Sequence, residues 1–107
     1  MVAAFDLIGA VDQTALRRAF AAVVRRHESL RTGFVVERGT LRARVSAAAD
    51  VPDVLTVAET PLADEAAQRA HVRAFAAQPV ALNGRSLLAA QFVPIMPGRA
   101  RLLVRLH

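Results

Sequence analysis

The feature that most constrains the fold is a change of hydrophobic period near residue 30. From Gln13 to about Glu28, apolar residues recur at spacings of three and four, which places them on one face of a helix. That face comprises Leu16, Phe20, Val23, Val24 and His27, and the opposite face carries Arg17, Arg18, Arg25 and Arg26. With Asp12 as a suitable N-cap, the pattern predicts an amphipathic helix packed on another element.

After residue 30 the period becomes two. In Arg31 to Glu37, Phe34 and Val36 lie on one side, and Arg38-Gly39 supplies a turn. Apolar and polar residues then alternate again, with Leu41, Ala43 and Val45 against Arg42, Arg44 and Ser46. This predicts a β-hairpin with one buried face.

A second helix is predicted to begin at Thr60-Pro61, because threonine is an acceptable cap and proline suits the first helical position. Asp64 and Glu65 favour the positive end of its dipole. Val72 and Phe75 mark its buried face, and Pro79 ends it.

Four further segments complete the predicted fold. Residues 3–9 and 54–57 read as short strands, and Pro97-Gly98 joins the longer strands Leu87–Met96 and Ala100–His107. The order is β-α-β-β-β-α-β-β, which indicates an α+β fold with two helices packed on a mixed β-sheet. We see no boundary within residues 1–107.

Composition excludes several functions. All fourteen basic residues are arginines and the net charge is +5, but they are scattered, and without Trp or Tyr a base-stacking surface is poorly supplied. We therefore expect no nucleic-acid partner. There is no cysteine, no signal-peptide pattern and no apolar run near the roughly 20 residues that span a bilayer. We expect a cytoplasmic protein without a membrane partner.

Few residues could carry chemistry by themselves. His27, His71 and His107 lack the close spacing of a helix-borne metal site, so no metal is predicted. His27, on the apolar helix face, is interpreted as a hydrogen-bonded core or interface histidine, and His71 as a surface residue. The carboxylate pairs Asp50/Asp53 and Asp64/Glu65 suit a loop and a helix terminus, and no nucleophile elbow or phosphate-binding glycine loop is present.

Charge placement in residues 26–32 is more specific. Arg26, Glu28 and Arg31 bracket the end of the first helix, and Leu30 is expected to return to the core. An arginine here can hold a carboxylate or the last helical carbonyls with its forked guanidinium, which would fix the chain direction. Solvated charges at an ordinary helix end are the other interpretation.

Three segments together resemble the condensation domain of non-ribosomal peptide synthetases, a two-lobed fold of the chloramphenicol acetyltransferase type. They are Arg26-His27-Glu28-Ser29-Leu30-Arg31-Thr32, the strand-to-helix entry Leu7–Asp12, and the ending Leu102-Leu103-Val104-Arg105-Leu106-His107. The resemblance covers nearly all of residues 1–107 but only about a quarter of such a domain. It implies a partial N-terminal lobe without its opening helix.

The resemblance also implies a reaction. Condensation domains join aminoacyl or peptidyl thioesters, carried on the phosphopantetheine arms of carrier proteins, into amides without a metal or cofactor of their own. His107 matches the first histidine of the motif His-His-x-x-x-Asp-Gly, whose catalytic second histidine would lie beyond it. The fragment is therefore expected to be inactive alone, and His107 as a residue without a role stays open. The implied partners are the rest of the domain and neighbouring carrier and adenylation domains.

One segment departs from the family pattern. Where the family shows Phe-Asp-Leu…Gly-Pro-Leu-x-Arg, this chain has Val80-Ala81-Leu82…Arg85-Ser86-Leu87-Leu88-Ala89, without the proline and the arginine of the pattern. Epimerisation domains, cyclising relatives, oxygenase-recruiting inactive relatives and stand-alone acyltransferases share the lobe. A non-catalytic docking or scaffolding module is a further interpretation. Uncovered apolar surface and a free strand edge predict self-association.

Overall fold

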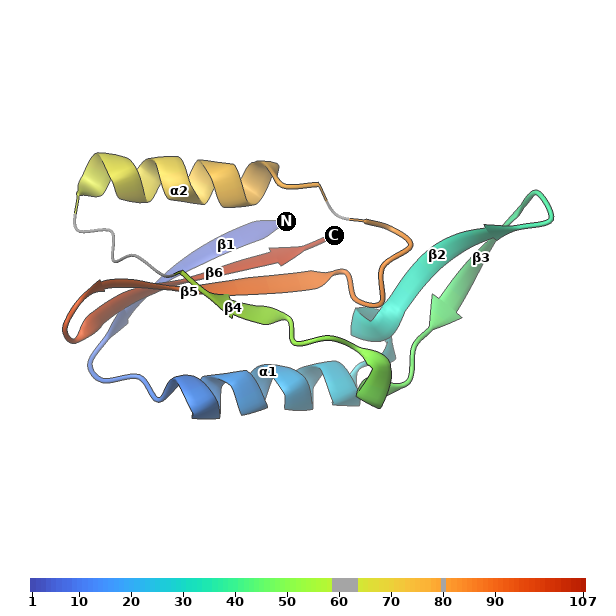
Figure 1. Cartoon of the computed structure of the whole chain (residues 1–107), viewed down its shortest axis with the longest axis horizontal. Coiled ribbons are helices and arrows are strands. Elements are labelled where there is room, and N and C mark those ends of the chain that lie inside the picture. The colour runs from blue at the N-terminus through green and yellow to red at the C-terminus, as the bar shows by residue number, and fades with distance from the viewer. Residues whose placement is uncertain (59–63, 80) are drawn as a thin grey trace.

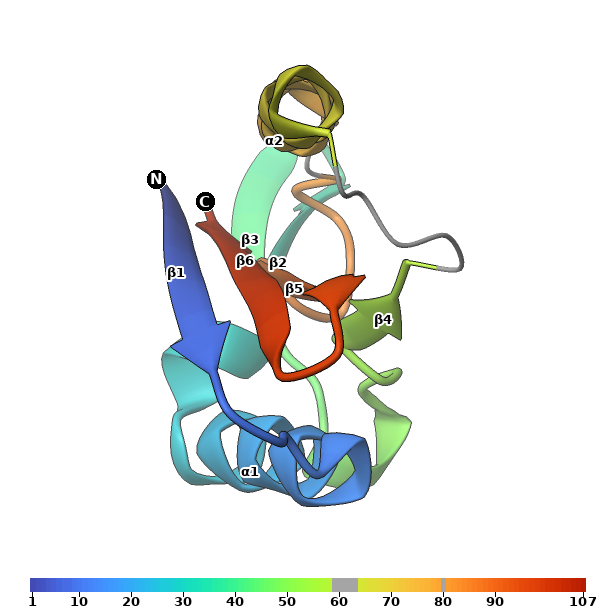
Figure 2. The same cartoon turned by 90° about the vertical axis from the view of Figure 1, so that its left-hand side faces the viewer.

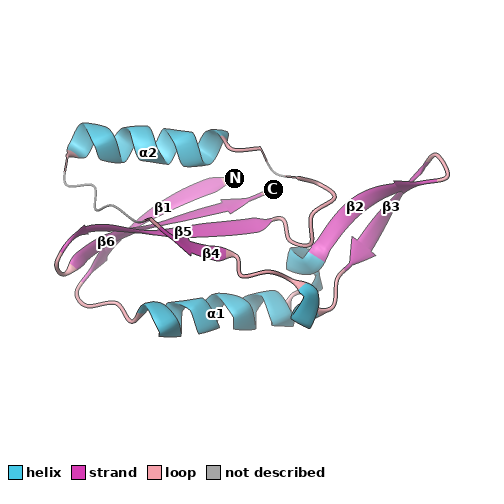
Figure 3. Cartoon of the chain, viewed as in Figure 1, coloured by secondary structure: helices cyan, strands magenta, loops and turns pink. Residues whose placement is uncertain are grey.

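Two helices enclose a β-sheet, and a hairpin extends from one end of this body (Figure 1). The computed structural model describes residues 1–58, 64–79 and 81–107. In chain order the helices and strands are β1 (Val2–Ile8), α1 (Gln13–Arg26), β2 (Thr32–Glu37), β3 (Thr40–Val45), β4 (Leu55–Val57), α2 (Glu65–Ala77), β5 (Leu88–Met96) and β6 (Arg99–Leu106). The predicted order β-α-β-β-β-α-β-β is confirmed, with short 3₁₀ turns at Glu28–Arg31 and Ala48–Asp50 (Figure 3).

The main sheet has four strands in the order β1-β6-β5-β4. β6 pairs antiparallel with both β1 and β5, whereas β4 pairs parallel with β5, so the predicted mixed sheet is confirmed. Leu103, midway along β6, is 0% exposed. β6 is therefore an internal strand with both faces covered. The residue that follows it, His107, is attached to the buried centre of the fold.

The two helices cover opposite faces of the sheet (Figure 2). Leu16 and Phe20 of α1 pack against a cluster that includes Phe92, whereas Phe75 of α2 packs with Val93 and Leu103. Successive residues of a strand point to opposite faces, so β5 and β6 supply apolar side chains to both layers. Among the described residues, no helix is long and apolar enough to cross a membrane.

α1 ends two residues earlier than predicted. His27 is its C-cap, in an extended conformation with its N–H donating to Val23 O, and its side chain is exposed. The prediction of a core histidine is therefore wrong, whereas that of an interface histidine stays a prediction, and Val23 is also 45% exposed. The chain leaves the helical path here to enter the 3₁₀ turn, so the helical period no longer sets the direction of residue 27.

α2 begins at Glu65, with Asp64 as its N-cap accepting from the N–H groups of Ala66 and Ala67. The predicted start at Thr60-Pro61 lies outside the described residues. His71 is half-buried and its Nε2 lies 2.6 Å from Gln91 Oε1, so the prediction of a surface histidine is wrong. The reason is that His71 faces β5, where Gln91 supplies a polar partner under the helix.

β2 and β3 form a separate two-stranded sheet with the predicted turn at Arg38-Gly39. Both turn residues have positive φ, 50° and 76°, as the tightest hairpin turns require. The predicted burial of one face is wrong, because Val36 and its cross-strand partner Leu41 are 71% and 67% exposed. The hairpin extends past the end of the main sheet, so the other described elements do not cover this face (Figure 1).

This exposed apolar face predicts self-association of the 11.5 kDa chain. Replacing Val36 and Leu41 with lysine (V36K/L41K) should shift the chain toward monomer, because the substitutions remove the apolar area that associates. Sedimentation velocity at several concentrations measures the change. The control Q13K/T14K adds the same charge at two exposed positions of α1 and should leave association nearly unchanged. A wild-type chain that sediments as a monomer at all concentrations would contradict the prediction.

Candidate functional site

His107 directly follows β6, and its backbone is held from the neighbouring strand. Its N–H donates to Leu87 O at 3.1 Å, just before β5 begins, while its side chain is exposed. On the other side of β6, the N-terminal amine of Met1 donates to Leu106 O at 2.8 Å. The backbone of His107 is therefore held at Leu87, and that of the preceding Leu106 is held from the β1 side.

Arg105 ties the same end of β6 to α2. Its guanidinium lies 4.9 Å from the centre of the Phe75 ring and donates to Phe75 O at 2.6 Å and to Gln78 Oε1 at 3.3 Å. Cations are favoured both at a helix C-terminus and over an aromatic face. Its Nε is buried and has no hydrogen-bond partner among the described residues. The end of α2 is thus attached to the strand that leads to His107.

Arg31 is the principal structural residue of the 26–32 stretch. Its Nε donates to Val24 O at 3.1 Å, its NH2 group to Arg25 O at 3.3 Å and its NH1 group to Ser46 O at 2.9 Å. Val24 and Arg25 carry two of the last helical carbonyls, which have no partner within a helix. A forked guanidinium can satisfy both and still reach the end of the hairpin. Arg31 therefore fixes the exit from α1 relative to β3.

The other members of the stretch divide into two groups. The side chains of Arg26, His27 and Glu28 are exposed and make no hydrogen bond or ion pair within the described part of the chain. Thr32 is bound locally, with Oγ1 donating to Glu28 O at 2.7 Å. Leu30 is half-buried and is not part of either hydrophobic core cluster of the described residues, so its return to the core stays a prediction. Only part of the motif thus has a visible structural role in this chain.

The stretch and His107 are connected by residues 82–88, a segment whose role the sequence did not reveal. Leu82 O accepts from Phe34 N at 2.6 Å, and Leu30 O accepts from Ser86 Oγ at 2.7 Å. Gly33 is buried so tightly that an added Cβ would overlap the carbonyl oxygen of Gly84. A glycine inside a strand pattern signals such a close approach of backbones, and this was the available clue.

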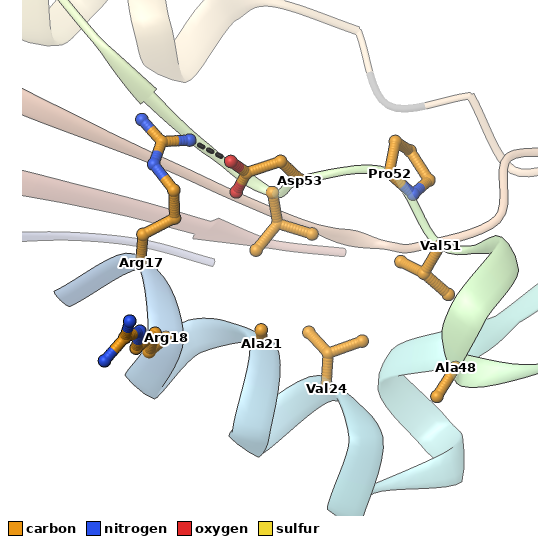
Figure 4. A pocket seen from close by; sticks show the side chains of 9 residues that line it. Arg17, Arg18, Ala21, Val24, Ala48, Val51, Pro52 and Asp53 are labelled. Carbon is orange, nitrogen blue, oxygen red and sulfur yellow. Dashed lines mark hydrogen bonds and ion pairs between the residues drawn. The ribbon is translucent and has the colours of Figure 1, made fainter. Parts of the chain in front are cut away.

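A cavity of about 240 Å³ lies between α1 and the segment before β4 (Figure 4). It is lined by Arg17, Arg18, Ala21, Val24, Ala48, Val51, Pro52, Asp53 and Val54. Arg17 pairs with Asp53 and also donates to Leu55 O at 2.9 Å, which joins α1 to β4. Asp53 is therefore held in an ion pair and is not half of a carboxylate pair with Asp50. The walls are mostly apolar, so the cavity suits an apolar group and offers no nucleophile.

Metal chemistry finds no support in the side-chain arrangement. Within residues 1–58, 64–79 and 81–107, no three His, Asp or Glu side chains gather into a possible metal site. The predicted absence of a metal site stays a prediction for the complete protein.

A mixed four-stranded sheet with one helix on each face defines the class of fold to which this chain belongs. The sequence model of the condensation domain matches residues 1–107. Surfactin synthase subunit 1 of Bacillus subtilis (strain 168) is 40% identical over 75 residues, which are 70% of this chain and 2% of that protein. The chain belongs to the condensation domain family.

Solved structures agree with this assignment. The SgcC5 protein from Streptomyces globisporus matches with a TM-score of 0.85 and 30% identity over all of this chain and 25% of that one. The condensation domain that mediates chain release from the enacyloxin polyketide synthase matches with a TM-score of 0.76 and 30% identity, over 100% of this chain and 22% of that one. The X-domain from teicoplanin biosynthesis matches with a TM-score of 0.84 and 27% identity, over 100% of this chain and 23% of that one. The partial chloramphenicol acetyltransferase-like fold is confirmed, and the chain spans about a quarter of these solved chains.

Proposed function

We propose that this chain is most of the N-terminal lobe of a condensation domain in a peptide synthetase, and that its parent forms amide bonds between carrier-bound thioesters. The observation that carries the proposal is the position of His107. It stands at the end of the internal strand β6, with its backbone N–H bound to Leu87 O. A catalytic loop that begins here would start from a backbone that the central strands hold in place.

In the proposed reaction the amine of the acceptor attacks the thioester carbonyl of the donor. The C–N bond forms as the C–S bond breaks, the sulfur leaves as the thiol of the donor's phosphopantetheine arm, and the amine gives up one proton. A histidine directly after His107 would accept or orient that proton, as a placed general base does. His107 would lie at the rim of the site and orient this loop. The reaction needs no metal or cofactor in this lobe.

The proposed partners follow from this reaction. The remainder of the domain would complete the substrate tunnel and cover apolar surface, and neighbouring carrier and adenylation domains would supply the aminoacyl thioesters. The protein would work in the cytoplasm. The 107-residue lobe alone would lack the tunnel and the catalytic base, and would therefore be inactive.

The proposal is tested with the protein encoded by the whole reading frame and two carrier proteins loaded with aminoacyl groups. Mass spectrometry should detect the amide product, and alanine in place of the residue directly after His107 should lower the rate by about 10² to 10⁴-fold. H27N is the control, because His27 is exposed and has no side-chain partner among the described residues. An unchanged rate after the alanine substitution would contradict the proposed role of the motif.

A non-catalytic docking module is the second candidate. Two observations favour it: Ser86 and Ala89 stand where the family pattern has proline and arginine, and the X-domain from teicoplanin biosynthesis, solved in complex with OxyB, matches with a TM-score of 0.86 and 26% identity. This candidate predicts no amide product with any loaded carrier, together with stable binding of the whole protein to a partner enzyme.

A further inference from the structure

Ser86 occupies a junction between two parts of the fold that are distant in sequence. Its Oγ donates to Leu30 O at 2.7 Å, so the hydroxyl reaches the 3₁₀ turn that follows α1. The same Oγ accepts from Leu88 N at 3.2 Å, at the first residue of β5. One half-buried hydroxyl thus holds the 26–32 stretch on one side and the start of a central strand on the other.

Leu87 lies between Ser86 and Leu88, whose N–H the Ser86 hydroxyl binds. Because the Ser86 hydroxyl binds the N–H two residues later, it closes a small local turn around Leu87. The carbonyl oxygen of Leu87 accepts the N–H of His107 at 3.1 Å. Leu88 is also the register partner of Leu106, the residue before His107. The orientation of the Leu87 carbonyl therefore determines where the backbone of His107 is held.

We propose that Ser86 is a positioning residue for His107. It transmits the fixed position of the 26–32 stretch to the end of β6 through a chain of three hydrogen bonds: Leu88 N to Ser86 Oγ, Ser86 Oγ to Leu30 O, and His107 N to Leu87 O. Its catalytic meaning rests on the proposed function, whereas the hydrogen-bond chain is a property of this lobe.

The neighbouring contacts do not replace this one. Gly33 against Gly84, and Phe34 N with Leu82 O, hold the earlier part of the segment, four or more residues before Leu88. Arg85 reaches a different region, donating to Asp50 O at 2.9 Å. Without the Ser86 hydroxyl, Leu30 O loses its side-chain donor, and among these described contacts only the pairing of β5 with β6 holds the turn at Leu87.

The test is amide hydrogen exchange of the chain by NMR, read at His107 and compared with Leu103 in the buried middle of β6. S86A should speed exchange at His107 about fivefold to tenfold, the size expected from losing one or two hydrogen bonds, while Leu103 changes far less. S86T keeps the hydroxyl and should restore slow exchange at His107. T56V is the matched control, because Thr56 Oγ1 also donates to a carbonyl, Ala90 O, at 3.4 Å, but at the β4 edge.

Equal acceleration at His107 and Leu103 would mean that Ser86 only adds general stability, and would overturn the proposal. The proposal would also be overturned if S86T exchanged like S86A, or if T56V had the same effect at His107. This readout needs no activity. A reading frame without the rest of the motif would remove the catalytic meaning and leave the exchange result standing, whereas an active parent with unchanged exchange in S86A would remove only the role of Ser86.

Discussion

Replacing Arg31 with alanine is expected to lower the free energy of unfolding by about 3 kcal/mol, because hydrogen bonds from a charged donor are worth more than neutral ones. Arg31 donates to three carbonyls, those of Val24, Arg25 and Ser46, and two of these bonds are partly buried. Alanine leaves the end of α1 without its donors and releases the base of the hairpin. Urea unfolding followed by circular dichroism measures the loss.

Two further variants distinguish the effect of the forked Arg31 guanidinium from the effect of its positive charge. R31K keeps the charge but cannot reach three carbonyls with a planar fork, so most of the loss should remain. R26A removes an exposed arginine from the last turn of α1 and should change stability by no more than about 0.5 kcal/mol. If R31A unfolded like R26A, the fixing role of Arg31 would be wrong.

Substituting Gly33 with alanine is the second large effect, with an expected loss of about 3 kcal/mol. An added Cβ at this position meets the carbonyl oxygen of Gly84, and it would lie 3.2 Å from Leu82 O. Both are backbone atoms, so no side-chain rotation can relieve the overlap. The segment 82–88 would have to move away from β2, which would also pull Ser86 from Leu30.

Thermal unfolding of G33A should be compared with that of G39A. Gly39 has a φ of 76° but no atom near its added Cβ, so G39A costs only the strain of a left-handed residue, about 1 to 2 kcal/mol. A loss in G33A no larger than in G39A would show that segment 82–88 yields easily. In that case it could not support His107.

The order of helices and strands was predictable because each element has its own hydrophobic period and its own boundary residues. Leu16, Phe20 and Val24 marked the buried face of α1, and Pro79 marked the end of α2. Burial of the hairpin was not predictable. Alternation shows that Val36 and Leu41 share a face, but whether anything covers that face depends on elements distant in sequence.

Residues of the candidate site that lie in a sequence motif were predictable, whereas residues whose role depends on tertiary contacts were not. His107 and Arg31 stand in recognisable patterns, and the fork of Arg31 at a helix end follows from its chemistry. From the sequence, Ser86 was only a departure from the family pattern, because its structural role depends on a hydrogen bond to Leu30, 56 residues away in sequence. The prediction for His71 was wrong for the same reason, since its partner Gln91 is 20 residues away in sequence.

The measurement that tests the central claim most directly is the sequence of the gene immediately after the His107 codon. If this lobe belongs to a catalytic condensation domain, the frame continues with histidine, three residues, aspartate and glycine, followed by the length of a second lobe. A continuation that lacks this histidine and aspartate, or a stop codon, would contradict the claim that His107 opens a catalytic loop.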